Sequence, residues 1–500
     1  MASIKKMPSP ITILMVVIIL AALATWLLPA GKYDTLAYQE SGSFILNTSG
    51  KETKLALTQK TLDSLHIQIG LDKFIQGDIR KPVSVPGTYH QLSPNKQGFL
   101  SVLQAPLKGI VDSIEIILFL FLIGGFINIF YSSGAMEKGL IYLSYKMKGK
   151  ESWLIIILGF LFSFAGSSFG MAEEALVFYP VLVPLFLAAG YDLLVPVAVI
   201  FAGTQIGYLS SFLNPFSTII ASNAAGINWT DGLYGRLLIF VISTGILIWY
   251  IVRYAQKVKK NPELSLVLRY DGLVKPPYPV LLETHADTLK PDKRSTILLL
   301  LFLFTFLTLI GGVIFLQWWF LEMSALFVVA SILMAIVQRM NEKAFIEKFI
   351  QGAESMLGVA FIIGVARGVT IVLNEGNITD SILFYASSAV SQMPSSLFIV
   401  MLLVIFMIFT LFISSSSGMA VVTMPILGSL AVVAGVPGRE IVNSYLFGMG
   451  IMGLITPTGL VLPSLALVNI SLKVWFKFIW PLMLILFVVC AIFLIIGIRI

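Results

Sequence analysis

The chain is poor in the side chains that most enzymes and metalloproteins use. It has one cysteine, Cys490, and three histidines among its 500 residues. A single cysteine excludes a disulfide framework and a thiol pair for metal or redox chemistry. The histidines fall in predicted loops and provide no clustered imidazole ligands. We also find no Gly-rich phosphate loop, catalytic triad or ATP-binding domain. The sequence therefore predicts no enzymatic activity, no cofactor, and energy supplied by an ion or solute gradient.

Charged residues are scarce as well. They make up 12% of the chain, whereas hydrophobic residues make up 57%, and the mean hydropathy is +0.93. Soluble domains do not reach this apolar content, so the composition indicates a polytopic membrane protein. The formal net charge of +7 mostly reflects lysines and arginines that orient membrane spans, and we expect no nucleic-acid partner.

Apolar stretches of about 20 residues, the length that crosses a bilayer, recur along the sequence. We predict about nine transmembrane helices, near residues 11–30, 114–133, 192–225, 236–252, 296–315, 320–338, 355–373, 439–467 and 478–498. The first is too long for a signal-peptide core, and no small-residue cleavage site follows Pro29. Two other apolar stretches, 152–188 and 395–434, are interrupted and too short in each arm to cross twice, so we predict two re-entrant hairpins.

Basic residues predict the orientation of these spans. Lysines between 138 and 150 and a basic loop at 253–295 are predicted to be cytoplasmic, as is the N-terminus. Residues 368–438 contain no Lys or Arg, so the second hairpin is predicted to open to the outside. The predicted organisation is a first transmembrane helix (1–30), an extracytoplasmic excursion with an interfacial helix (31–113), repeat 1 (114–252), a cytoplasmic loop (253–295), two connecting helices (296–338), a cytoplasmic interfacial helix (339–354) and an oppositely oriented repeat 2 (355–498). The fold class is therefore an all-α, inverted-repeat membrane protein.

The two hairpins carry the same interruption. The segment AGSSFGMAEEALVFYP, starting at Ala165, corresponds to ISSSSGMAVVTMP, starting at Ile413. Each is followed by a second break, LNPFST at 213–218 and ITPTG at 455–459. Repeated Gly/Pro/Ser interruptions at matching places are typical of discontinuous helices that meet at a site near the membrane midplane.

Helix ends inside a membrane present free amides and free carbonyls. Amides and hydroxyls suit a carboxylate, whereas carbonyls and side-chain oxygens suit a sodium ion. The candidate solute and ion ligands are Ser167, Ser168, Gly170, Asn214, Ser217 and Thr218 in the first half and Ser415, Ser416, Ser417, Gly418, Thr456 and Thr458 in the second. Small residues can also serve only close helix packing, but four motifs in register favour a binding site.

Glu173 and Glu174 follow the first interruption, far from any Lys or Arg in the sequence. A carboxylate at that depth is costly unless it is protonated or paired. Val421 and Val422 occupy the matching place in the second half, so the pair breaks the symmetry. Three roles stay open: countercharge for a cationic or amino-bearing solute, proton carrier, or structural partner of a buried cation.

Arg367 lies in an otherwise apolar predicted span, where an ionisable residue is by default functional or paired. We hypothesise that it pairs with a solute carboxylate or with Glu173 and Glu174. Snorkelling of its guanidinium toward the outer surface is the alternative.

The motifs GMAEEALVFYP, SFLNPFSTIIAS, SSSSGMAVVTMP and GLITPTG resemble those of the YfcC-type C4-dicarboxylate carrier and basic amino-acid antiporter family, within the wider ion-transporter superfamily. The similarity extends from VPGTYH at 85–90 to the last span. It implies an elevator-type secondary transporter of the bacterial plasma membrane, commonly a homodimer, with a scaffold and a moving transport domain. The substrates it implies are arginine or ornithine, C4-dicarboxylates and other small organic acids.

The tip residues and the two glutamates together favour a basic amino acid. A dicarboxylate would be repelled by ionised Glu173 and Glu174 unless these are protonated or neutralised by Arg367. Exchange and uptake coupled to Na⁺ or H⁺ both stay open. From another class, the chain could be a transporter-like sensor or a channel, although a channel would need a continuous polar lining.

Overall fold

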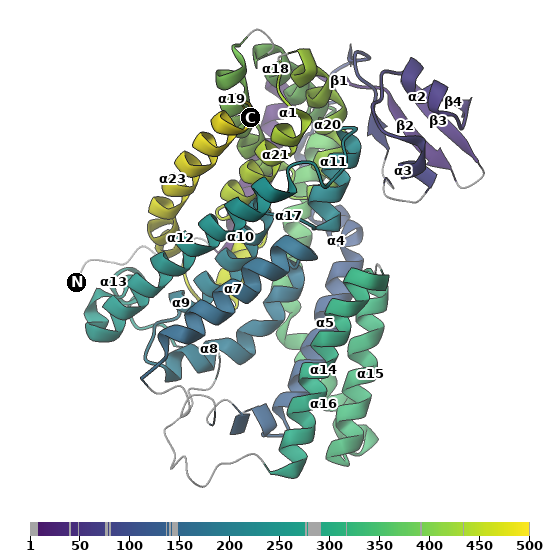
Figure 1. Cartoon of the computed structure of the whole chain (residues 1–500). Helices are drawn as coiled ribbons and strands as arrows, with labels where there is room; N and C mark the ends of the chain where they lie inside the picture. The colour runs from purple at the N-terminus through teal and green to yellow at the C-terminus, as the bar shows by residue number, and fades with distance from the viewer. Residues whose placement is uncertain are drawn as a thin grey trace.

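The computed structural model describes residues 9–39, 42–48, 50–75, 79, 82–136, 138, 139, 142, 149–275, 278, 292–316, 318–390, 393–433 and 435–499. They form a bundle of apolar helices with a small β-structure at one side (Figure 1). Among the described residues, eight helices are long and apolar enough to span a bilayer: α1 (Pro10–Leu27), α5 (Ile114–Tyr131), α12 (Leu233–Lys260), α14 (Lys293–Leu316), α15 (Phe320–Gln338), α17 (Leu357–Glu375), α19 (Ser395–Phe412) and α23 (Leu472–Gly497). The protein is therefore a multi-pass helical membrane protein.

Seven of the nine predicted spans overlap these helices, and the other two are interrupted helices. The 192–225 stretch contains α9 (Leu194–Val197), η2 (Ala198–Ala202), α10 (Gly203–Leu209), η3 (Pro215–Ile219) and α11 (Ile220–Ala224). The 439–467 stretch contains α21 (Gly438–Gly453) and α22 (Val461–Ala466). Both breaks fall at the Asn-Pro and Thr-Pro motifs.

The predicted hairpin segments are also interrupted helices. The first contains α7 (Ser152–Ser168), η1 (Glu173–Phe178) and α8 (Tyr179–Ala188), and the second contains α19 and α20 (Ser416–Val433). The expectation that every arm is too short to cross is wrong for α19, which has 18 residues. Residue 434, the predicted end of the second hairpin, lies outside the described residues, as do 143–148 and 279–291 in the basic segments. Re-entrance and the inverted repeat stay predictions.

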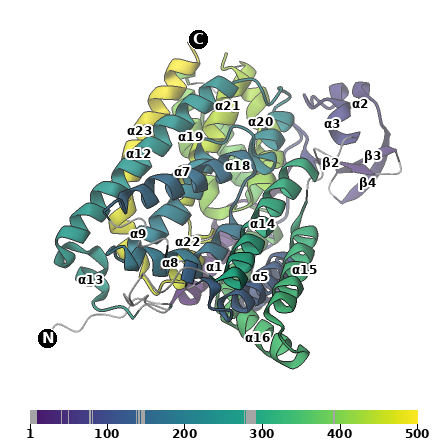
Figure 2. The ribbon, with the colours of Figure 1, turned by 60° about the horizontal axis from the view of Figure 1, so that its bottom comes forward.

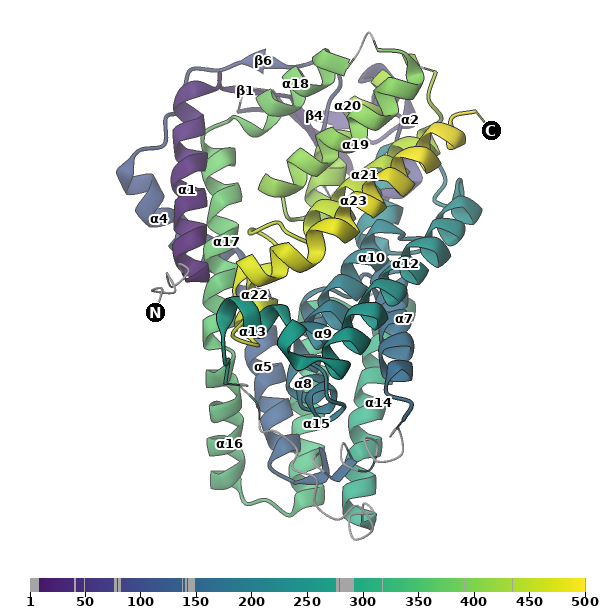
Figure 3. The same ribbon diagram turned by 90° about the vertical axis from the view of Figure 1, so that its left-hand side faces the viewer.

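The two segments predicted as interfacial helices are helical and pack against spans, and their position at the membrane surface stays a prediction. Figures 2 and 3 show α16 (Glu342–Ser355) beside α5, with α14 and α15 nearby. The other, α4 (Phe99–Asp112), lies along α17. Two ion pairs join α4 to α17: Arg367 with Asp112, and Lys108 with Glu375 at 2.6 Å.

Glycines allow this close approach of α4 and α17, and substituting one of them tests how tightly the two helices pack. A Cβ at Gly368 would lie 2.8 Å from the carbonyl oxygen of Ala105. Gly368→Ala should therefore lower the free energy of unfolding by about 1–3 kcal/mol. Gly358→Ala on the same helix meets nothing within 4 Å and should be neutral or stabilising. Thermal unfolding in detergent measures both, and equal melting temperatures would contradict the packing argument.

Residues 31–91 form a small domain, here called the β-domain. Its sheet has the order β4-β3-β2-β5, and all its pairings are antiparallel. The elements are β1 (Gly31–Lys32), β2 (Thr35–Gln39), β3 (Ser43–Thr48), β4 (Lys51–Ala56), α2 (Gln59–Ser64), α3 (Leu71–Ile75), β5 (Val83–Ser84) and β6 (His90–Gln91), with β1 paired to β6. The expectation of an all-α chain is therefore wrong for this segment.

The β-domain docks on α18 (Thr379–Val390) and reaches the interrupted helices. The backbone N–H of Tyr33 donates to Asp380 at 3.1 Å, and the Tyr89 ring stacks on Phe384 with centroids 4.0 Å apart. Its β5 strand also packs against α20. Helix α13 (Leu266–Asp271), which follows η4 (Pro262–Leu264), lies on the side of the bundle away from the β-domain (Figure 1).

Candidate solute-binding site

The first interruption is a tight turn that requires glycine. Helix α7 ends at Ser168, and Gly170 has a φ of +78°, which is open to glycine but strained for other residues. The Tyr208 hydroxyl in α10 donates to the Gly170 carbonyl oxygen at 2.9 Å. A Cβ at Gly170 would lie 2.7 Å from Asn214 Oδ1. The tip of the first hairpin segment is thus fixed against the facing interrupted helix.

Asn214 organises the facing break. Its Nδ2 donates to the Gly166 carbonyl at 3.2 Å, while its Oδ1 accepts from the backbone N–H groups of Phe216 and Ser217 at 2.8 and 3.2 Å. It therefore caps the helix that restarts after the break. The structure brings Asn214 and Gly170 together, as the sequence predicted, and gives Asn214 a structural role in the same place.

A buried cluster of hydroxyl groups lies beside Asn214. The hydroxyl oxygens of Ser211 and Thr218 are 2.5 Å apart, and those of Ser211 and Ser217 are 3.4 Å apart. The Ser167 carbonyl oxygen accepts from the Leu213 N–H at 3.2 Å. The side chains of Ser167, Ser211, Ser217 and Thr218 are fully buried. The first tip and its facing break thus form one enclosed group of oxygen atoms.

The two serines of the first tip differ in their side-chain partners. The Ser168 hydroxyl donates to the Phe164 carbonyl within its own helix at 2.6 Å. The Ser167 hydroxyl is buried and finds no hydrogen-bond partner among the described residues. Because an unpartnered buried hydroxyl is costly, Ser167 is the better placed of the two to accept a ligand.

Glu173 and Glu174 lie in η1, directly after the tip, and both are half-buried. Glu174 Oε2 accepts from the Ala172 N–H at 2.9 Å. Both carboxylates lie near Tyr208, the residue that holds the tip. The structure therefore places the glutamate pair at the first tip.

Arg367 forms its ion pair with Asp112 at the end of α4. The hypothesised direct pair with Glu173 or Glu174 is absent among the described ion pairs, although the Arg367 charge acts on Glu173. About 30% of the arginine side chain is exposed, so Arg367 is not sealed within the bundle.

The second tip lies between α19 and α20. Ser415 Oγ accepts from the Gly418 N–H at 3.2 Å, and the Tyr445 hydroxyl donates to the Ser416 carbonyl at 2.9 Å. Thr458 donates to the Leu411 carbonyl at 3.2 Å. Each tip therefore has a tyrosine that holds one of its carbonyl groups and a broken helix bound to the end of its first arm.

Three other candidates belong to the same region but differ in their roles. Thr456 lies in the break after α21 and donates to the Met452 carbonyl in the last turn of that helix at 2.8 Å. Ser416 and Ser417 form the first residues of α20 and are half-buried. The structure brings the candidates of each half together around their own tip.

The two tips are neighbours because α10 packs against α21. A Cβ at Gly450 in α21 would lie 2.6 Å from the backbone nitrogen of Leu209 in α10. Tyr208 and Tyr445, the tyrosines that hold the two tips, also lie near each other. The breaks of both halves thus meet in the interior of the bundle.

Sequence reasoning missed Tyr208, Ser211, Tyr445 and Asp112. Tyr208 and Ser211 immediately precede the LNPF motif, so the polar residues YLSS before the break were a usable signal. Tyr445 and Asp112 had no such local signal, because their roles depend on how distant helices pack.

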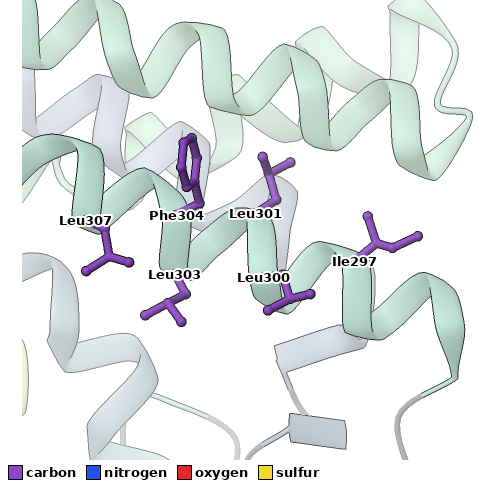
Figure 4. Close-up of a pocket in the computed structure, with 6 residues that line it drawn as sticks. All are labelled: Ile297, Leu300, Leu301, Leu303, Phe304 and Leu307. Atoms are coloured by element: carbon purple, nitrogen blue, oxygen red, sulfur yellow. The ribbon is translucent and has the colours of Figure 1, made fainter.

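An apolar groove on α14 is a different kind of surface. Its volume is about 460 Å³, and its lining residues are Ile297, Leu300, Leu301, Leu303, Phe304 and Leu307 (Figure 4). The labelled side chains are all carbon, so the groove offers no polar group to a charged solute. It suits contact with lipid rather than solute binding.

Interrupted helices that enclose a polar centre within a multi-pass helical bundle define a class of solute transporters. The sequence model described as C4-dicarboxylate anaerobic carrier (DcuC) matches residues 7–499, and the chain belongs to this family. The resemblance inferred from the motifs is thereby confirmed, and the protein is a membrane transporter.

Two relatives align along nearly the whole chain. A Haemophilus influenzae protein named "Uncharacterized protein" is 37% identical over 494 residues, which cover 98% of this chain and 97% of the relative. An Escherichia coli protein named "Putative basic amino acid antiporter YfcC" is 29% identical over 510 residues, which cover 97% and 95%.

Two solved structures were also similar. The crystal structure of the Alcanivorax borkumensis YdaH transporter has a TM-score of 0.41 and 14% identity, and covers 98% of both chains. The structure of Neisseria gonorrhoeae MtrF, described with a class of antimetabolite efflux pumps, has a TM-score of 0.40 and 15% identity, and covers 98% of this chain and 95% of that one.

Proposed function

We propose that the protein is a secondary transporter of a small carboxylate-bearing solute, and that the solute is a basic amino acid such as arginine or ornithine. The observation that supports this choice is the charge at the first tip. Glu173 and Glu174 lie beside Tyr208, and the nearby Arg367 already pairs with Asp112. Three carboxylates thus accompany one guanidinium. This excess of negative charge favours a solute that carries an extra positive charge.

The solute's α-carboxylate would bind at the second tip. Helix α20 begins there at Ser416, so the amides of its first turn face the tip, and the Gly418 amide is already accepted by Ser415 Oγ at 3.2 Å. A carboxylate is stabilised at such an end by the amides and by the helix dipole. In this arrangement the second tip would bind the carboxylate of the solute, and the first tip would bind its cationic end.

We propose that a coupling ion uses the oxygen cluster of the first tip. Hydroxyl groups of Ser211, Ser217 and Thr218 and the Ser167 carbonyl oxygen supply the neutral oxygen ligands that suit Na⁺. If the coupling ion is H⁺, the half-buried Glu173 or Glu174 would carry it. Sodium and pH gradients imposed separately distinguish these two mechanisms.

The family resemblance supports further parts of this proposal. We propose that the protein works as a homodimer in the bacterial plasma membrane, with its N-terminus in the cytoplasm. Transport would follow an elevator movement of the two hairpin segments and broken helices relative to α4, α5, α16 and α17.

A C4-dicarboxylate is the second candidate, favoured by the description of the family. Such a solute would need protonation of Glu173 and Glu174, or release of Arg367 from Asp112. It predicts that uptake of succinate rises with external acidity, whereas arginine transport through ionised glutamates would not.

Uptake into proteoliposomes tests the choice of solute. We expect the wild-type protein to carry radiolabelled arginine or ornithine, and Glu173→Gln or Glu174→Gln to reduce this uptake about tenfold, since each removes one countercharge. Glu354→Gln removes an exposed carboxylate on α16 and should have no effect. Uptake of succinate alone would refute the basic amino-acid proposal. Binding without flux of any solute would indicate a sensor.

A further inference from the structure

Two lysines at the start of α23 converge on one aromatic ring. Lys473 Nζ and Lys477 Nζ each lie 5.2 Å from the centroid of the Tyr270 ring in α13. The lysines are four residues apart, so they share one face of the helix, where two like charges repel. The ring attracts each ammonium group but does not neutralise either charge.

The groups around this pair leave an excess of positive charge. Arg269 on α13 and Lys275 after it are exposed and basic. Asp271 is the nearby acid, but its two oxygens accept from the Ser471 N–H and hydroxyl at 2.8 and 2.7 Å. Glu263 lies in η4, on the preceding turn. Among the described ion pairs, none includes Lys473 or Lys477.

An exposed apolar stripe continues from the lysines along α23. Phe476 and Trp480 are 42% and 45% exposed, and their rings stack with centroids 5.3 Å apart. Leu484, Val488 and Ile492 extend the stripe at helical spacing, each about half exposed. Figure 3 shows α23 crossing the outside of the bundle with its first turns beside α13. Along α23, the lysines are therefore followed by aromatic rings and then by aliphatic side chains. This order matches the headgroups, the interface and the acyl chains of one bilayer leaflet.

We propose that Lys473, Lys477 and Tyr270, together with Phe476 and Trp480, form a binding site for an anionic phospholipid. The phosphate would bridge the two ammonium groups and remove their mutual repulsion. The acyl chains would lie along the aromatic pair and the aliphatic stripe. The basic residues at this end predict that it faces the cytoplasm, where anionic lipids attract juxtamembrane lysines.

The purified full-length protein in detergent tests this site. Phosphatidylglycerol should raise the melting temperature of the wild type more than phosphatidylcholine does. Lys473→Gln/Lys477→Gln should lose at least half of that lipid-specific increase, and native mass spectrometry should detect fewer bound phosphatidylglycerol molecules. An unchanged increase in the double variant would overturn the proposal.

Matched variants separate this site from general charge effects. Lys257→Gln/Lys260→Gln removes two exposed lysines from the end of α12 and should keep the full lipid response. Tyr270→Phe keeps the ring, so phosphatidylglycerol should raise its melting temperature as much as that of the wild type. Phosphatidylglycerol should raise the melting temperature of Tyr270→Leu less. Equal losses in both lysine pairs, or equal stabilisation by inorganic phosphate, would also overturn the proposal.

Discussion

Glu440→Gln should lower the free energy of unfolding by about 1–3 kcal/mol, because it removes a buried carboxylate whose charge acts on buried Arg236 and which accepts from Arg439 and Asn443. Arg236 in α12 is fully buried, and its Nη2 donates to the Trp229 carbonyl. Its Nε and Nη1 have no hydrogen-bond partner among the described residues. The carboxylates of Glu440 in α21 and of Asp231 act on the Arg236 charge, Glu440 more strongly, although neither forms a described ion pair with it. Without the Glu440 charge, the buried guanidinium would keep only the weaker compensation from Asp231.

Arg236→Met should lower the free energy of unfolding by less than Glu440→Gln does, because Glu440 then keeps two other partners. Arg439 Nε donates to it at 3.2 Å and Asn443 Nδ2 at 3.1 Å. The double variant Arg236→Met/Glu440→Gln should be more stable than Glu440→Gln alone, since it removes the stranded charge. Denaturation in mixed micelles measures all three. Exposed Arg253→Met on the same helix is the control, and a double variant no more stable than Glu440→Gln would refute the electrostatic coupling between Arg236 and Glu440.

Gly170→Ala should abolish nearly all transport. A φ of +78° costs a non-glycine residue about 1–2 kcal/mol, and the new Cβ would lie 2.7 Å from Asn214 Oδ1. The Asn214 side chain cannot move away from the new Cβ without losing its hydrogen bonds to the Gly166 carbonyl and to the amides of Phe216 and Ser217. The substitution should therefore separate the first tip from its facing break.

The measurement is uptake into proteoliposomes of the solute that the wild type carries. Gly245→Ala in α12 is the matched control, because its Cβ would meet nothing within 4 Å. It should transport normally. Normal transport by Gly170→Ala would show that the turn at the first tip is not needed for solute movement.

The spans were predictable because long apolar runs have one stable arrangement in a membrane. The runs that begin near Ile114 and Phe320, for example, become α5 and α15. The β-domain was not predictable in the same way, because its strands, such as TLAYQ and KETKLA, are short and weakly alternating. Their pairing depends on turns at Gly42 and Gly50, both of which have positive φ.

The candidate site was predictable in its tips and not in its distant partners. Gly170 and Asn214 belong to interruptions that the sequence marks with Gly, Ser and Pro. Arg367 stood out as a charge in an apolar span, but its partner Asp112 lies 255 residues away in sequence. Tyr445 looked like an ordinary apolar-helix residue until helix packing placed its hydroxyl on the Ser416 carbonyl.

The β-domain forms a strap between two parts of the bundle. It is anchored on α18 through Asp380 and Phe384. At its other end, the backbone of Gln68 lies so close to Gly226, just after α11, that a side chain there would collide with it. Any sliding of α11 away from α17 and α18 must first release this contact. The strap would therefore limit how far the interrupted helices can move before the β-domain loses its contact with α18 or with Gly226.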